Sequence, residues 1–144
     1  MKKKIIVATF FMFGLASISA QSVVGKWKTI DDETGEARSI VEIYKEGGKI
    51  FGKIVKLIDP EKENPTCFKC DDDDPRKDKP VLGMVIIDGL KDKGDEYSGG
   101  KILDPEKGKE YKCKIWVDED DSDKLNVRGY IAFLYRTQNW YRVK

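Results

Sequence analysis

KEYKCKIWVDEDDSDKLNVRGYIAF, residues 109–133, alternates apolar and polar side chains on both sides of a short acidic segment. In its first half, lysines fall between the members of an apolar face made of Tyr111, Cys113, Ile115 and Val117. A period of two is typical of a β-strand with one buried face, and DEDDSD has the polar residues that turns prefer. The stretch therefore predicts two antiparallel strands, with Cys113 facing the core.

Short runs rich in β-branched and aromatic residues recur along the rest of the chain. No stretch after residue 21 shows a helical period, and segments containing Gly, Asp and Pro separate most of the runs, as hairpin turns require. Eight strands are predicted, at residues 25–30, 37–45, 49–58, 81–90, 97–103, 109–117, 124–133 and 137–143.

Eight short strands joined mostly by tight loops predict an all-β, antiparallel, up-and-down meander. The meander can form a sandwich or a closed barrel, and we favour the eight-stranded barrel because closure leaves no exposed sheet edge. A barrel of this size has room inside for side chains or one small ligand. The single long connection, residues 59–80, interrupts the pattern, and long loops of this kind are usually functional or disordered.

The first 20 residues have the layout of a secretory signal peptide. Lysines at positions 2–4 precede an apolar run at 5–15, and small residues then lead to Ala20. The apolar run is too short for a stable membrane span. We therefore expect cleavage after Ala20, a single mature domain over residues 21–144, no membrane span after cleavage, and a periplasmic or secreted location.

The composition argues against several classes of function. The chain has 144 residues and a net charge of +1, and removing residues 1–20 with their three lysines leaves 124 residues with a net charge of −2. This balance gives no electrostatic case for nucleic-acid binding, which needs a basic face. The chain has no histidine, the commonest general base and metal ligand. We therefore expect a non-catalytic protein with no cofactor and no metal.

The stretch CFKCDDDDPRKDKP, residues 67–80, looks most like a chemical site. A thioredoxin-type pair begins a helix that lowers the thiol pKa, whereas the aspartates at 71–74 would raise it. A zinc site needs four ligands, and the chain has three cysteines. A disulfide is favoured in an oxidising compartment. Because Cys113 is predicted to face the core, we predict the Cys67–Cys70 disulfide, although a bridge to Cys113 would close a longer loop.

Two tryptophans fall near the ends of the predicted barrel strands. Trp27 lies in the first strand, and Trp140 and Arg142 lie in the last. The first and last strands of a closed barrel are neighbours, so a Trp–Arg stacking contact is predicted there. Its structural role, closing one end of the barrel, is favoured over a ligand role.

Arg128 lies in the middle of the strand LNVRGY and shares a face with Tyr130. If that face is inside, Arg128 is a natural anchor for a carboxylate. The alternation favours Val127 inside, because an unpaired buried guanidinium is costly, and predicts a mainly apolar lumen. The candidate ligand contacts are Trp27, Met84, Arg128, Tyr130 and Trp140.

With these segments in place, the chain resembles a family of small secreted bacterial proteins of unknown function with lipocalin-like (calycin) barrels. The matching pieces cover most of residues 24–143, and the first of them also resembles the Gly-x-Trp opening of lipocalins. They are GKW, the CxxC loop followed by KPVLGMVII, SGGKILDPEKGKEYKCKIW, KLNVRGYI and RTQNWYRV. The resemblance implies the fold and the compartment.

Three functions follow from these observations. The leading hypothesis is a binding protein that holds a small apolar or amphipathic ligand in the barrel lumen. The alternative is a partner-binding protein that uses the acidic loop and the barrel rim, with a lumen filled by side chains. A thiol–disulfide protein ranks third. Close-packed Trp, Tyr and Leu inside would favour a filled lumen, and several glycines there would favour a cavity.

Overall fold

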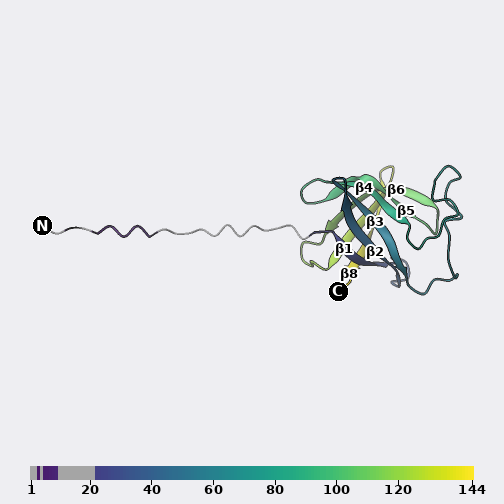
Figure 1. The fold of residues 1–144 in the computed structure, drawn as a ribbon, viewed down its shortest axis with the longest axis horizontal. Coiled ribbons are helices and arrows are strands. Elements are labelled where there is room, and N and C mark those ends of the chain that lie inside the picture. The colour runs from purple at the N-terminus through teal and green to yellow at the C-terminus, as the bar shows by residue number, and fades with distance from the viewer. Residues whose placement is uncertain (1–2, 4, 10–21) are drawn as a thin grey trace.

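The computed structural model describes residues 3, 5–9 and 22–144, and its strands close into one antiparallel barrel (Figure 1). Each strand pairs with the next in the chain, and the last pairs with the first. The all-β, up-and-down, eight-stranded barrel predicted from the sequence is therefore confirmed. The strands are β1 (Gly25–Ile30), β2 (Ala37–Glu46), β3 (Lys49–Leu57), β4 (Val85–Asp92), β5 (Tyr97–Asp104), β6 (Lys109–Val117), β7 (Lys124–Ile131) and β8 (Leu134–Arg142).

Side chains fill the middle of the barrel. Residues opposite each other on antiparallel strands share a face, and the inward pairs Trp27–Val41 and Ile115–Val127 are buried. Gly52 also faces inward, and a Cβ there would come within 3.0 Å of the Ile87 side chain. At this level of the barrel the interior has no space for even one more methyl group without a shift of its neighbours. The largest fully buried side chains include Trp27, Ile43, Ile87, Leu90, Ile115 and Leu125.

The fourth strand begins later than predicted. It starts at Val85 rather than at residue 81, because Gly83 takes a φ of +87° and the Met84 N–H donates to the Val81 carbonyl. A positive φ is easy for glycine and incompatible with a regular strand. Gly83 therefore belongs to a turn.

The hairpin between β7 and β8 is tighter than predicted. Ile131 pairs directly with Leu134, so residues 132–133 form the turn that the sequence analysis assigned to the end of a strand. Ala132 has a φ of +51°, a conformation that hairpin turns normally obtain from Gly or Asn. The turn was missed because alanine and phenylalanine are not typical residues for this conformation.

The long connection between β3 and β4 covers the outside of the barrel. The Arg76 guanidinium donates to the Val85 carbonyl on β4 and forms an ion pair of 2.7 Å with Glu110 on β6. Ile86 and Leu103 alternate with inward-facing residues, so they lie on the outer face, yet both are buried. The loop therefore extends the core outward, at the end of the barrel away from the N-terminal segment (Figure 1).

The predicted cleavage site, Ala20, lies outside the described residues. Within residues 3, 5–9 and 22–144, no helix has the length and apolar character needed to cross a membrane.

Candidate functional site: a pocket at the N-terminal end of the barrel

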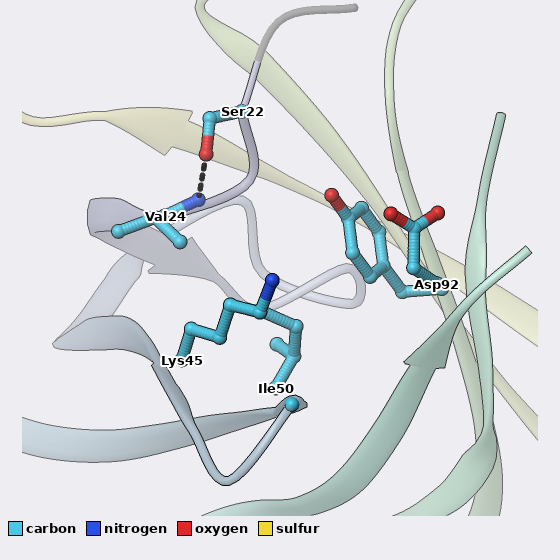
Figure 2. A pocket seen from close by; sticks show the side chains of 7 residues that line it. Ser22, Val24, Lys45, Ile50 and Asp92 are labelled. Atoms are coloured by element: carbon cyan, nitrogen blue, oxygen red, sulfur yellow. Dashed lines mark hydrogen bonds between the residues drawn. The ribbon is translucent and has the colours of Figure 1, made fainter. Parts of the chain in front are cut away.

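A pocket of about 140 Å³ opens at the end of the barrel where residues 22–24 lie, called here the N-terminal end (Figure 2). Lys45 pairs with Ile50 across the β2–β3 hairpin, and Asp92 pairs with Tyr97 across the β4–β5 hairpin. All four occupy inward positions near the rim, so the two hairpins bring their side chains to one space. The lining is Ser22, Val24, Lys45, Gly48, Ile50, Asp92 and Tyr97.

The pocket joins an apolar floor to a rim with both signs of charge. Ile50 is buried beneath it, while Lys45 and Asp92 are exposed on different strands around the opening (Figure 2). Among the described residues, neither of these two charges has an ion-pair partner. Burial, followed by the negative charge of Asp92, raises the pKa of Tyr97, so its phenol remains a hydrogen-bond donor at neutral pH.

The N-terminal segment closes the rest of this end. The Val23 side chain is buried, and its carbonyl accepts a hydrogen bond of 2.8 Å from the Trp27 indole N–H. The Arg142 guanidinium lies over the Trp27 ring, with Cζ 4.2 Å from the ring centroid. It also donates to the carbonyls of Ser22 and Ser122. The predicted Trp–Arg contact is present, and it ties both ends of the folded domain together.

The structure separates the five candidate ligand contacts, and none of them lines this pocket. Trp27 and Trp140 are buried inside the barrel, and Met84 is buried just before β4. Arg128 and Tyr130 alternate with the buried Val127 and therefore lie on the outer face, which is the arrangement that the alternation favoured. A lumen anchor at Arg128 is thus inconsistent with the fold.

The cysteine loop is built into the outer wall. Cys67 and Cys70 lie at disulfide-bonding distance, with their Cα atoms 5.4 Å apart, and both are buried. Cys113 is separate and buried, and burial raises the pKa of its thiol to about 12. Gly108, in the β5–β6 turn, lies so close to this loop that a Cβ there would come within 2.1 Å of the Lys69 carbonyl oxygen. The arrangement is that of a structural clasp.

Comparison with known proteins places this architecture in a family. Residues 25–142 match the model of a family described as an uncharacterized protein conserved in bacteria (DUF2147). The chain belongs to the DUF2147 family. The resemblance drawn from the sequence is therefore confirmed.

A solved structure shares the fold of this DUF2147 chain. It is HP1028 from the human pathogen Helicobacter pylori, which is described as a member of the lipocalin family. The two chains are 19% identical, with a TM-score of 0.71. The match covers 85% of this chain and 84% of that one. At 19% sequence identity, the structural similarity shows only the fold, a lipocalin-like barrel.

A local sequence match links the DUF2147 chain to a larger protein. Over 66 residues it is 36% identical to a tyrosine–tRNA ligase from Lactobacillus helveticus. The match covers 42% of this chain and 16% of the ligase. The chain thus spans a small part of the length of that protein.

Sequence reasoning missed the residues that line the pocket. Lys45 is in phase with the buried Val41 and Ile43, and Asp92 is in phase with the buried Leu90. A charged residue that continues an apolar face at the end of a strand indicates the rim of a barrel, and this signal was present in the sequence. The sequence carried no signal that two hairpins and residues 22–24 would come together.

Across the described residues, no cluster of three acidic, histidine or cysteine side chains is arranged to hold a metal ion.

Proposed function

We propose that this chain is a non-catalytic binding protein that holds a small amphipathic molecule in the pocket at the N-terminal end of the barrel. The observation that carries the proposal is the combination of a buried Ile50 floor with Lys45 and Asp92 at the rim. Small-molecule sites typically join an apolar surface to a few polar groups that orient the ligand. A lipocalin-like barrel is consistent with this role.

The size of the pocket limits the ligand. A cavity of about 150 Å³ holds a benzene-sized group, so the 140 Å³ available here suits an apolar tail of about six heavy atoms. The packing around Gly52 leaves no room for a long acyl chain to enter the middle of the barrel. Since neither charge at the rim has an ion-pair partner among the described residues, the head group that fits best carries an amine and a carboxylate.

Three probes of similar length test this proposal, with binding followed by NMR shifts of Ile50 and Tyr97. Norleucine carries both charges, hexanoate carries only the negative one, and hexylamine only the positive one. We expect norleucine to bind best, and Lys45→Met and Asp92→Asn each to weaken it about fivefold or more. Hexanoate should respond only to loss of the lysine, and hexylamine only to loss of the aspartate.

Matched control variants on the outer face of the same hairpins separate the pocket from general charge effects. Lys49→Met and Asp88→Asn remove exposed charges from the outer faces of β3 and β4, and they should leave all three probes unaffected. Equal responses to the rim and control variants, or the absence of shifts at Ile50 and Tyr97, would refute the proposed site.

Binding to a partner protein, with a filled interior, is the second candidate. The close packing inside the barrel favours it, because side chains already occupy most of the space that a lumen ligand would need. This candidate does not depend on the pocket, and the surface that supports it is described below.

The proposal includes a non-catalytic role and a place outside the cytoplasm. Cys67 and Cys70 are buried, and attack on a disulfide requires access to a sulfur atom, so we expect no reduction of insulin above the buffer rate. Steady turnover in that assay would make a thiol–disulfide enzyme the better interpretation. The signal-peptide layout and the cysteine pair support a periplasmic or secreted location.

A further inference from the structure

Arg128 is held in one orientation on the outer face of β6, β7 and β8. Its Cζ lies 4.9 Å from the centroid of the Trp116 ring and 4.2 Å from that of Tyr135. Its Nε donates a hydrogen bond of 2.8 Å to the Thr137 hydroxyl. These contacts come from the two strands on either side of β7, so the guanidinium is oriented before any ligand arrives.

The charge of Arg128 is not balanced within the described part of the chain. The other four arginines each form at least one ion pair with Asp or Glu, and they are Arg38, Arg76, Arg136 and Arg142. Arg128 has no ion-pair partner in the described part of the chain. Its terminal nitrogens make no hydrogen bond there and are not fully buried. The two terminal NH2 groups of the fixed guanidinium, which carry four N–H donors, therefore remain open to solvent.

Apolar side chains continue this surface to the tip of the β7–β8 hairpin. Tyr135, on the same face as Arg128, is 62% exposed, and Phe133 in the turn is 88% exposed. Contiguous exposed apolar residues of this size usually mark an interaction site. The turn that presents them holds Ala132 at a φ of +51°, and strain of this kind is concentrated at functional positions.

We propose that this surface, made of Trp116, Arg128, Phe133 and Tyr135, docks an acidic segment of a partner protein. A carboxylate of the partner binds the free side of the Arg128 guanidinium, whose planar fork matches its two oxygens. An apolar side chain of the same segment packs on Phe133 and Tyr135. Because the barrel is closed and offers no strand edge, the segment docks through side chains.

The charges at this end of the barrel favour a protein segment over an anionic membrane. Asp32 and Glu33 lie beside the hairpin, where they pair with Arg136. The long loop at the same end adds the exposed acidic residues at 71–73. A flat anionic surface would meet these carboxylates together with Arg128, whereas a narrow segment contacts Arg128 alone.

A blocked tripeptide with phenylalanine between two glutamates tests the proposal, alongside its glutamine analogue. We expect the glutamate peptide to bind, with NMR shifts at Trp116 and Tyr135, and Arg128→Gln to weaken it about fivefold or more. The glutamine analogue should bind weakly and equally to the native protein and to that variant. Phe133→Ser should weaken both peptides by the same factor.

Controls distinguish this site from the pocket and from general electrostatics. Lys26→Gln removes an exposed cation from the outer face of β1, and Lys45→Met alters the pocket, and neither should affect peptide binding. Equal binding of the glutamate peptide to native protein and Arg128→Gln would overturn the proposal. Cosedimentation with phosphatidylglycerol vesicles that depends on both Arg128 and Phe133 would overturn it in favour of a lipid surface.

Discussion

Two arginine–aromatic contacts, one inside the barrel and one outside, serve different purposes. Arg142 lies over the buried Trp27, donates to two carbonyls and pairs with Asp123. Arg128 lies over Trp116 and Tyr135 at similar distances but has no carboxylate partner in the described part of the chain. The fold supplies Arg142 with two carbonyl acceptors and a carboxylate. Arg128 keeps N–H donors that are available to a ligand.

The difference shows that an arginine stacked on an aromatic ring has a role set by its remaining hydrogen bonds. A guanidinium has five N–H donors, and the ring contact uses none of them. Where the fold supplies acceptors, removing the arginine leaves those acceptors unpaired and destabilises the protein. Where it does not, removal costs little stability and affects binding.

The largest expected effect contrasts the two tryptophans. Trp27→Ala should lower the free energy of unfolding by about 3–5 kcal/mol, because it leaves a cavity in a close-packed interior. Trp116→Ala should lower it by about 1 kcal/mol, since Trp116 is only partly buried. Urea unfolding followed by circular dichroism measures both. Losses of equal size would contradict the division into an internal and an external contact.

The next effect concerns Arg142 itself. Arg142→Met keeps an apolar stem but leaves the Ser22 and Ser122 carbonyls and Asp123 without their partner. We expect a loss of about 2 kcal/mol in the free energy of unfolding. The free energy from chemical denaturation at high and low salt separates the screened ion pair from the hydrogen bonds. No measurable loss would mean that Arg142, like Arg128, is dispensable for folding.

The cysteine clasp tests whether the outer wall contributes to the stability of the fold as the interior does. Replacing Cys67 and Cys70 by serine should cost up to about 2 kcal/mol, because the closed ring is short. Mass mapping of non-reduced protein should show the 67–70 link. Cys113, whose pKa burial raises to about 12, should react with iodoacetamide only after unfolding. A dominant link to Cys113 would show that the outer loop is not formed as described.

The smallest expected effect is that of Arg128→Ala. Because this side chain makes one hydrogen bond and two ring contacts at a partly exposed site, its removal should cost about 0.5–1 kcal/mol. Binding of the hexanoate probe should be unchanged, since Arg128 lies outside the barrel. Loss of probe binding with the fold intact would return Arg128 to the role of ligand anchor.

The sequence carried most of the fold because its signals are local to each strand. Alternation in residues 109–133 identified two strands and placed Cys113 and Val127 inside, and the order of strands brought Trp27 next to Arg142. The predicted strand bounds were wrong at two places, Gly83 and Ala132, where the structure has turns. In the second, the turn is imposed by pairing of β7 with β8 and not by turn-forming residues.

The candidate sites were decided by the tertiary structure. A period of two reports which face of its own strand a residue occupies, and it says nothing about which rim residues of other hairpins lie nearby. Lys45 and Asp92 are 47 positions apart and line one pocket because β3 pairs with β4 and the sheet curves into a barrel. In the same way, only the folded arrangement shows that four arginines find carboxylates while Arg128 finds none among the described residues. Residues that are close in the sequence determine where a strand forms and which face each side chain occupies. The pocket and the partner-binding surface depend on contacts between different strands of the folded barrel.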